Sequence, residues 1–469
     1  MSQSFLEQLE ARANQSKSLL CIGLDPHADL LPENTAAAAR DLCFRVIDAT
    51  ADLACAFKPN SAFFEAFGAQ GFAALKEVIA HVPHDIPVIL DAKRGDIAST
   101  AEAYAHAAFD ELGATAITLS PYLGREAVTP FVKRATRGAF ILARTTNPSS
   151  AEFQTLIVDG RPLYLHVAEQ AMSWSDQNNI GLVVGANDLT ALTAIRQKLP
   201  KAWFLVPGVG AQGGDLEAAL DVGLREDGLG LLINVSRSVM SGTDPHHEAI
   251  RLWTIINERR QRLVHKSAEH RRIQVLAQAL ADAGCVQFGT FTLKSGQQSP
   301  IYLDLRRLVS YPQQLQIIGR LLVEVLARLP FEHIAAIPYA ALPIATAASL
   351  AGGYSLVYPR REVKTYGTKA TVEGVFHPND TAVVVDDLAT TGDSKFEAIA
   401  RLTDAGLLVK DIVVVIDREQ GALETLQAAG YRFHALATLH QLLDAWERLG
   451  VLSAVMRREV DDYLKSQRV

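Results

Sequence analysis

The chain has 469 residues, of which 49% are hydrophobic and 21% are charged. This composition is that of an ordinary globular protein, and the length predicts two or three domains. The net charge of −7 argues against a general nucleic-acid-binding protein, although local basic clusters can still hold small phosphorylated substrates.

Cysteine usage and hydropathy narrow the class of protein further. The four cysteines, Cys21, Cys43, Cys55 and Cys285, lack the spacing of disulfide frameworks or metal sites, so we expect buried thiols in a reducing compartment. The N-terminal residues lack the apolar segment of a signal peptide, and no uninterrupted apolar stretch is long enough to span a bilayer. We therefore expect a cytoplasmic protein without a membrane partner.

The first half of the chain alternates short apolar runs with segments of helical period, such as Thr35–Leu53 and Ser99–Leu112, and Ala249–Leu263 supplies a last helix. Eight apolar runs predict strands: Ser18–Asp25, Ala54–Asn60, Val88–Asp96, Ala116–Tyr122, Gly138–Thr145, Gly181–Asn187, Trp203–Gly210 and Gly230–Arg237. Strands buried on both faces and separated by helices form a parallel sheet. Eight such units in roughly 250 residues predict a (β/α)8 barrel.

Most of these runs are apolar at the start and chemically specific at the end. The strand ends read Asp25-Pro26-His27, Lys58-Pro59-Asn60, Asp91/Lys93/Asp96, Ser120-Pro121-Tyr122, Arg144-Thr145-Thr146-Asn147, Pro207-Gly208-Val209-Gly210 and Asn234-Val235-Ser236-Arg237. Active sites of such barrels lie at the C-terminal ends of the strands, so we expect these residues to converge on one mouth.

The most highly charged of these strand ends is Leu90–Ile97. Asp91 and Lys93 are two residues apart and share a face of the strand, whereas Arg94 points away and Gly95 permits a turn before Asp96. Such a cluster is costly to desolvate unless the charges pair, and in isolation a structural ion pair explains it equally well. The polar ends of the other strands favour a reaction centre instead.

The last two strands of the predicted barrel carry the features of a phosphate site. A glycine-rich segment, Gly208–Asp215, follows the seventh strand, and Arg237 follows the eighth. Backbone N–H groups of such loops bind phosphate in many barrels, and an arginine adds a charged fork suited to phosphate oxygens. The barrel is therefore predicted to bind a phosphorylated ligand.

A polar, charge-rich stretch at Glu258–Arg262 and His265–Arg272, predicted to be helical in part, separates two kinds of organisation. We place the boundary there, giving domains 1–265 and 266–469. The second domain opens with a helix at Ile273–Ala283 and a hairpin or paired strands in Phe288–Gly296. Strands are then predicted at His333–Tyr339, Ser355–Pro359, Thr381–Asp387, Asp411–Asp417 and Phe433–Leu439, and helices at Pro312–Leu329, Ile344–Leu350, Ser394–Ala405 and Ala422–Ala429. This alternation predicts an open, doubly wound, Rossmann-like α/β sheet.

The Asp-x-Lys-x-x-Asp-Ile sequence at Asp91–Ile97, together with Lys58, resembles the Lys–Asp–Lys–Asp array of the orotidine 5′-monophosphate (OMP) decarboxylase family. The similarity covers about residues 15–240 and includes Gly23–Pro26, Phe57–Asn60, Ser120–Tyr122, Pro207–Gly210 and Asn234–Arg237. The resemblance implies that Lys93 protonates C6 of the pyrimidine as CO₂ leaves, that Asp91 lies against the departing carboxylate, and that no cofactor is needed. Its further assignments are Lys58 and Asp96 in the charge network, Asp96 and Thr100 in the partner subunit's site, Asp25 and Lys58 on the ribose, Ser120 on the pyrimidine, and Gln212 and Arg237 on the phosphate.

In the second domain a buried strand delivers Asp386 and Asp387, and a turn then opens a helix. The acids can accept hydrogen bonds from ribose hydroxyls, and the turn of Thr390, Thr391, Gly392 and Ser394 can hold a phosphate at the helix N-terminus. The whole string Val383–Ser394 resembles the 5-phosphoribosyl-1-diphosphate motif of type I phosphoribosyltransferases.

Two other segments, Phe291–Gly296 with Ser299–Tyr302 and the basic segment Arg360–Gly367, resemble orotate phosphoribosyltransferases. The resemblance implies a mobile loop that closes over the diphosphate. It implies that Lys364 is the main catalytic cation, that Mg²⁺ arrives with the diphosphate and has no direct protein ligand, and that substrate contacts come from Lys294, Tyr339, Arg360, Arg361 and Tyr366. Where many bacterial members have a Tyr-Lys pair, this chain has Tyr339-Ala340, as fused eukaryotic forms do.

Together the two halves resemble the bifunctional uridine monophosphate synthases that place the decarboxylase first. The resemblance implies the last two steps of UMP biosynthesis, small-molecule substrates, and a homodimer or higher homo-oligomer. Two alternatives stay open at this point: the second domain could be weakly active or regulatory, or the barrel could be a metal-dependent lyase or synthase acting on a related sugar phosphate.

Overall fold

The computed structural model describes residues 3–209, 214–292, 296–360 and 371–466. The chain divides into two compact units, Met1–Ser267 and Ala268–Val469. The division falls inside helix α12 (Pro245–Asp282), so the charge-rich stretch predicted to be helical in part is helical throughout. Among the described residues, no helix is both long and apolar enough to cross a membrane.

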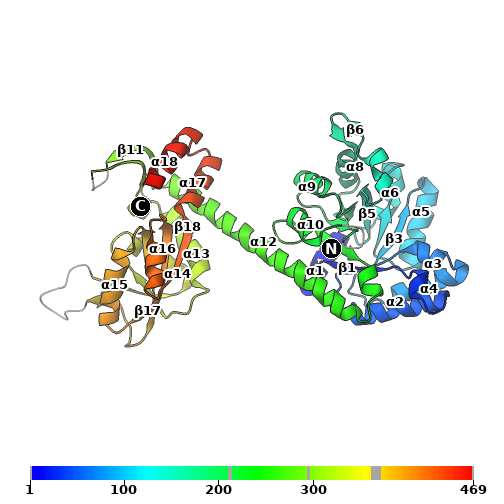
Figure 1. The fold of residues 1–469 in the computed structure, drawn as a ribbon, viewed down its shortest axis with the longest axis horizontal. Coiled ribbons are helices and arrows are strands. Elements are labelled where there is room, and N and C mark those ends of the chain that lie inside the picture. The colour runs from blue at the N-terminus through cyan, green and yellow to red at the C-terminus, as the bar shows by residue number, and fades with distance from the viewer. Residues whose placement is uncertain (1–2, 210–213, 293–295, 361–370, 467–469) are drawn as a thin grey trace. The chain divides into compact units, whose positions relative to one another are not determined.

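The first unit is the predicted parallel barrel (Figure 1). Its strands are β1 (Leu20–Leu24), β2 (Ala56–Pro59), β3 (Ile89–Arg94), β4 (Ala116–Leu119), β5 (Gly138–Arg144), β8 (Ile180–Val184), β9 (Phe204–Val206) and β10 (Leu231–Val235). The sheet runs in the order β2-β1-β10-β9-β8-β5-β4-β3. Parallel bridges from Phe57 to Val88 and from Asn60 to Asp91 join β2 to β3 and close the ring. All eight predicted strands are therefore confirmed.

Helices surround the strands in the first unit, as burial of both faces of a parallel strand requires (Figure 1). They are α1 (Phe5–Gln15), α2 (Ala36–Thr50), α3 (Ser61–Glu65), α4 (Gly68–His81), α5 (Ala98–His106), α6 (Arg125–Val132), α7 (Ala151–Gln154), α8 (Leu163–Met172), α9 (Leu189–Lys198), α10 (Leu216–Gly223), α11 (Arg237–Met240) and the start of α12. A short hairpin, β6 (Ile157–Val158) and β7 (Arg161–Pro162), was not predicted and lies between α7 and α8.

Helix α1, also absent from the prediction, packs at the N-terminal ends of the strands. A capping box between Ser4 and Glu7 starts it. Phe5 is fully buried, and its ring meets Phe140 edge-on with centroids 6.0 Å apart. Gly138, the first residue of β5, leaves room for that ring, since a Cβ there would lie 2.1 Å from it.

The second unit is the predicted open sheet, with the order β15-β14-β13-β16-β17-β18. Its strands are β13 (His333–Ala336), β14 (Ser355–Pro359), β15 (Val372–Glu373), β16 (Thr381–Ala389), β17 (Leu408–Asp417) and β18 (Arg432–Thr438), and only β15 pairs in antiparallel fashion among the described ladders of this sheet. A hairpin is formed by β11 (Val286–Thr292) and β12 (Gln298–Leu303), and it extends beyond the predicted segment Phe288–Gly296 because its second strand begins at Gln298.

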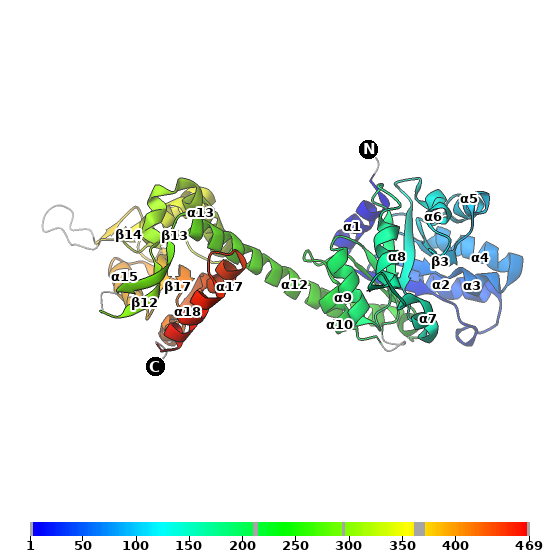
Figure 2. The same cartoon turned by 90° about the horizontal axis from the view of Figure 1, so that it is seen from above.

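Side chains on alternate sides of the central strands enter two separate hydrophobic cores, so helices cover both faces of the sheet. One face carries the end of α12, α13 (Pro312–Leu326), α14 (Ala341–Gly352) and α17 (Leu439–Arg448), and the other carries α15 (Asp393–Asp404) and α16 (Ala422–Ala428). The unpredicted helices α17 and α18 (Ala454–Ser466) lie side by side in both views (Figures 1 and 2). Trp446 of α17 is fully buried and donates a hydrogen bond of 2.9 Å to the Ala277 carbonyl of α12.

Replacing Phe5 tests the closure of the barrel by α1. Phe5→Ala should lower the free energy of unfolding of the barrel by about 3–5 kcal/mol, because it leaves a cavity where a buried ring contacted β5. Ligand binding at the opposite, C-terminal ends of the strands should be unchanged. Denaturant unfolding followed by circular dichroism measures the effect. Asn14→Ala, at an exposed position of the same helix, is the control, and an equal loss in both variants would contradict the assignment.

Candidate active site

Two adjacent cavities occupy the C-terminal mouth of the barrel. One has a volume of about 680 Å³ and is lined by Gly208, Gly214, Arg237 and Ser238 among others. The second, of about 490 Å³, is lined by Lys58, Asp91, Lys93, Thr118, Thr145, Thr146, Asn147 and Gln154 among others. Both cavities share four lining residues, Asp25, Asn60, Pro207 and Asn234, so they form the two ends of one elongated site.

Three charged side chains meet at the inner end of the second cavity. Lys58 Nζ lies 2.8 Å from Asp91 Oδ2, and Lys93 Nζ lies 2.6 Å from Asp91 Oδ1. Lys58 and Asp91 are buried, whereas the Lys93 side chain is half exposed towards the cavity. The arrangement holds one carboxylate between two ammonium groups, of which Lys93 is the more exposed.

An irregularity in the pairing of β3 with β4 positions Asp91 and Lys93. Leu90 pairs with Ile117 and Arg94 pairs with Leu119, so the three residues from Asp91 to Lys93 lie opposite the single residue Thr118. The Thr118 hydroxyl accepts hydrogen bonds from the amides of Ala92 (3.1 Å) and Lys93 (3.0 Å) and donates to Asp91 Oδ1 (2.9 Å). Lys93 has a φ of 46°, which is rare for a residue other than glycine. The bulge aims both Asp91 and Lys93 into the cavity.

The charges stabilise one another electrostatically. Burial alone would raise the pKa of Asp91, but the charges of Lys58 and Lys93 hold it well below its ordinary value. Burial acts to lower the pKa of Lys58, yet Asp25 and Asp91 raise it above its ordinary value. Asp91 and Lys58 therefore stay ionised at neutral pH although both are withdrawn from water.

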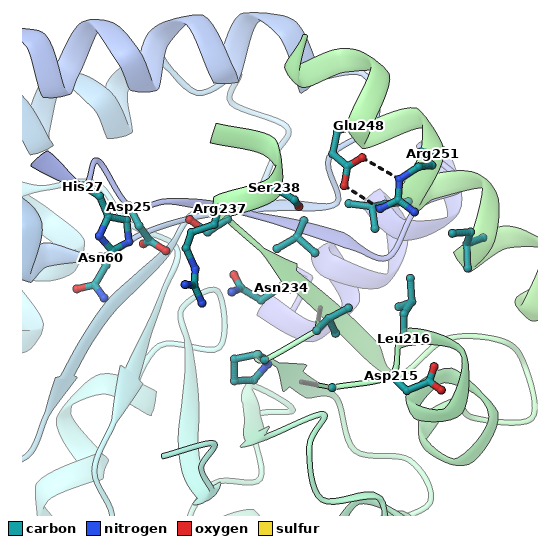
Figure 3. A pocket seen from close by; sticks show the side chains of 18 of the residues that line it. Asp25, His27, Asn60, Asp215, Leu216, Asn234, Arg237, Ser238, Glu248 and Arg251 are labelled. Atoms are coloured by element: carbon teal, nitrogen blue, oxygen red, sulfur yellow. Dashed lines mark hydrogen bonds and ion pairs between the residues drawn. The ribbon is translucent and has the colours of Figure 1, made fainter. Parts of the chain in front are cut away.

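The outer cavity suits a ribose and a phosphate. Figure 3 shows Arg237 and Asn234 extending into it near Asp25. The buried oxygens Asp25 Oδ1 and Asn234 Oδ1 have no hydrogen-bond partner within the described part of the chain. A buried acceptor without a hydrogen bond costs free energy, so these oxygens suit a ligand that donates, such as a sugar hydroxyl. Gln212, predicted to contact the phosphate, lies outside the described residues.

Three predicted site residues lie apart from these cavities. Asp96 accepts a hydrogen bond from the amide of Ile97, and Thr100 is exposed on α5. The Ser120 amide donates to the Arg94 carbonyl, which places Ser120 beside β3. None of the three is among the described residues that line either cavity.

Sequence reasoning missed Thr118, which is buried in mid-strand and gave no signal. Asn234 and the Thr145–Asn147 segment stand at strand ends that were expected to converge on the mouth, and they do line the site, although no role had been assigned to them. Gln154 belongs to the short helix α7, which was not predicted; its Oε1 accepts from the Thr145 amide at 2.9 Å.

The second unit gathers its predicted site residues at one edge of the sheet. Tyr339 follows β13, Arg360 follows β14, and Asp386 and Asp387 lie near the end of β16. These strands are neighbours and parallel, so their carboxyl ends meet. Thr390 and Thr391 form the turn, Gly392 has a φ of 102° at the start of α15, and Ser394 lies in its first turn. Lys294, Arg361, Lys364 and Tyr366 lie outside the described residues.

The two adjacent acids have different environments. Asp386 is buried; its Oδ2 lies 2.7 Å from the ammonium of buried Lys395, and its Oδ1 accepts from the Asp387 amide at 2.9 Å. Asp387 is half-buried, and burial together with the charge of Asp386 raises its pKa to about 7. Lys395 therefore fixes Asp386, whereas Asp387 has no cation bound to it among the described ion pairs.

Two arginines follow strands at this edge. Arg360 pairs with Glu373 of β15 in this structure, so a diphosphate would have to compete with that carboxylate. Arg418, which follows β17, was not predicted. Its amide donates to the Ala389 carbonyl at 2.9 Å, and its buried Nε has no hydrogen-bond partner among the described residues. Burial lowers the pKa of Arg418, and an anionic ligand could accept a hydrogen bond from its unpaired Nε.

Comparison with known proteins identifies the family of each unit. Residues 18–252 match the family described as orotidine 5′-phosphate decarboxylase / HUMPS. The bifunctional enzyme PyrF/PyrE of Nostoc sp. is 36% identical over 463 residues, which cover 95% of this chain and 97% of that protein. The orotidine 5′-phosphate decarboxylase of Herpetosiphon aurantiacus is 50% identical over 254 residues, covering 53% of this chain and 94% of that protein.

A solved structure extends the likeness over both units. The UMP synthase of Leishmania donovani is 48% identical, with a TM-score of 0.55 and coverage of 99% of this chain and 100% of that one. The chain therefore belongs to the bifunctional PyrF/PyrE enzyme family, with an orotidine 5′-phosphate decarboxylase barrel followed by an orotate phosphoribosyltransferase domain.

Proposed function

We propose that this chain converts orotate to UMP in two steps. The second unit joins orotate to 5-phosphoribosyl-1-diphosphate, giving OMP and diphosphate, and the barrel then removes CO₂ from OMP. The single observation that supports the proposal most strongly is the elongated site of the barrel, whose two ends and shared middle match the three parts of a nucleotide. Four buried, unpaired cysteines suit a reducing compartment, and we place the activity in the cytoplasm.

The nucleotide fits this site in one direction. Arg237, near Gly208 and Gly214, faces the phosphate, and the unpaired oxygens of Asp25 and Asn234 accept from ribose hydroxyls. The pyrimidine then occupies the inner cavity above Lys93. Gln212 is proposed as a further phosphate contact, and Ser120, although outside the lining of both cavities, remains a proposed contact to the pyrimidine edge.

The chemistry of the barrel depends on a fixed cation beside a developing carbanion. The bond between C6 and the carboxylate breaks, its electron pair stays on C6, and Lys93 donates a proton there while CO₂ departs past Asp91. An ammonium held in place by Asp91 stabilises that charge with little reorganisation. Lys58 keeps Asp91 ionised and oriented.

In the transferase, Asp386 and Asp387 are proposed to accept from the ribose hydroxyls of the diphosphate donor. The turn from Thr390 to Ser394, with the N-terminus of α15, holds its 5′-phosphate. Proposed contacts to the diphosphate or orotate come from Lys294, Tyr339, Arg360, Arg361 and Tyr366. We add Arg418 as a proposed partner for an orotate oxygen, because its buried Nε has no partner among the described residues. Lys364 supplies the main charge opposite the leaving diphosphate.

We propose that Mg²⁺ enters the transferase site with the diphosphate. The described part of the chain has no group of three or more His, Cys, Asp or Glu side chains suited to a metal ion, and Asp386 is already bound by Lys395. This donor set fits an ion held by phosphate oxygens and water, as Mg²⁺ prefers. When bound, Mg²⁺ neutralises charge on the diphosphate.

We also propose that the barrel works as a dimer, with Asp96 and Thr100 entering the partner's site. Both residues lie outside their own cavities, on the loops and helix that follow β3. The same region exposes apolar side chains, including Ile97 (55% exposed) and Tyr122 (91% exposed). A partner subunit would cover these side chains and complete the charge network.

Lys93→Ala should lower the rate of CO₂ release from OMP by a factor of at least about 10³, because the proton donor and the cation beside C6 are both lost. Diphosphate formation from orotate should continue at the wild-type rate. Separate assays of the two half-reactions on the full chain measure this, with Lys133→Ala, an exposed lysine paired with Glu102, as the control.

Loss of both half-reactions in Lys93→Ala, with the fold preserved, would contradict the two-site assignment. A chelator distinguishes the two half-reactions in a second way. It should stop diphosphate formation and leave CO₂ release unchanged. If it stopped CO₂ release, the barrel would instead be a metal-dependent lyase.

Lys364→Ala should abolish orotate consumption and leave CO₂ release from supplied OMP intact, because it removes the cation opposite the leaving diphosphate. Orotate absorbance and OMP formation follow the first reaction. Lys410→Ala, on the exposed side of β17, is a control of equal charge change. Unchanged orotate consumption in Lys364→Ala would favour a regulatory role for the second unit.

Mixed dimers test the shared site. Lys93→Ala and Asp96→Ala should each be inactive alone, yet co-expressed chains should regain about a quarter of wild-type CO₂ release, since half of the dimers then hold one intact site. Activity that stays absent in the co-expressed sample, with dimers present by light scattering, would place Asp96 in its own subunit's site or outside the reaction.

A further inference from the structure

Arg144, the last residue of β5, is the centre of a hydrogen-bond network behind the inner cavity. Its side chain is only 12% exposed. Nε donates to Asp188 Oδ2 at 2.9 Å, and Nη1 donates to the Ser150 hydroxyl and, at 3.2 Å, to Gln154 Oε1. Neither Arg144 nor Ser150 is among the described residues that line the cavity, so Arg144 can act only through its neighbours.

Those neighbours form one wall of the cavity. Gln154 accepts from the Thr145 amide at 2.9 Å and donates from Nε2 to the Thr145 hydroxyl at 2.8 Å. The Thr145 hydroxyl donates in turn to Asn147 Oδ1 at 2.6 Å. Thr145, Asn147 and Gln154 all face the cavity that contains Lys93. The polar groups of this wall are therefore oriented by a chain of bonds that begins at Arg144.

The other end of the network is fixed. Asp188 caps helix α9 by accepting from the Ala191 amide at 2.9 Å, and its second oxygen holds Arg144. A guanidinium that is largely withdrawn from water needs such partners, because losing one leaves an unpaired buried charge. The network thus links the segment Thr145–Gln154, called the β5 loop, to the N-terminus of helix α9.

The geometry points to Arg144 as a positioning residue that sets nucleobase recognition by the decarboxylase through the β5 loop. This inference rests on the proposed function, in which the pyrimidine lies in the inner cavity and the phosphate at the Arg237 end. The β5 loop presents hydroxyl and amide groups, which can donate to and accept from the carbonyl and N–H edge of a pyrimidine. No residue of the network is among the described residues that line the cavity at the phosphate end.

Two ligands that differ only in the base separate this role from general damage. UMP has the base, and ribose 5-phosphate lacks it. In Arg144→Met the inhibition constant of UMP against CO₂ release should rise by roughly tenfold or more, the effect of losing hydrogen bonds from a charged group. The constant of ribose 5-phosphate should stay within about twofold of wild type. This assay reads only the decarboxylase site of the full chain.

Two further variants distinguish a local effect on the β5 loop from general misfolding. Ser150→Ala removes one loop partner of Arg144 without touching the cavity and should weaken UMP in the same direction by a smaller factor, again sparing ribose 5-phosphate. Arg161→Met is the matched control: Arg161 pairs with Glu169 beside the β6–β7 hairpin and should change neither constant.

The outcomes separate two failures. If the wild-type chain releases no CO₂ from OMP, the proposed function itself fails. If it does, but Arg144→Met and Ser150→Ala weaken both ligands equally or neither of them, only the inference about Arg144 is overturned.

Discussion

The decarboxylase site depends on the chain of ion pairs Lys58–Asp91–Lys93. A lone carboxylate in the position of Asp91 would be strongly destabilised, and a lone buried lysine in the position of Lys58 would lose its proton. Together the three groups carry a net positive charge, and Lys93, at the outer end, is the most exposed of them. The rest of the barrel serves this constraint: β2 and β3 must be neighbours for Lys58 to reach Asp91, and that adjacency is what closes the ring.

The second unit uses a related device for a different purpose. A buried lysine, Lys395, again binds a strand-end acid, Asp386, and compensates for its burial. Here the neighbouring acid is left with a raised pKa of about 7, so it is the group most ready to change its bonding when a ligand arrives. In the barrel the Lys58–Asp91 pair orients the cation Lys93. In the transferase the Lys395 ammonium orients Asp386, which is a hydrogen-bond acceptor.

The strands and their polar ends could be predicted because they depend on local patterns: continuous apolar runs, glycine turns and charges at strand ends. Helices α1, α17 and α18 were missed since their function is to cover a surface that exists only after folding, as Phe5 does over Gly138. Thr118 could not be predicted either. Its importance comes from the irregular register between β3 and β4, which the sequence of either strand alone does not show.

The same distinction explains why the sequence assigned a chemical role to Lys93 but only a strand-end position to Arg144. A residue that reacts must present its chemistry directly, so its type and its position at a strand end identify it. A residue that positions others acts through partners such as Asp188 and Gln154, which are 44 and 10 residues away along the chain. Its role depends on a network that forms only when the loops after β5 and β8 lie side by side. Reactive residues can therefore be predicted from a strand pattern, whereas the residues that select the substrate require the folded loops.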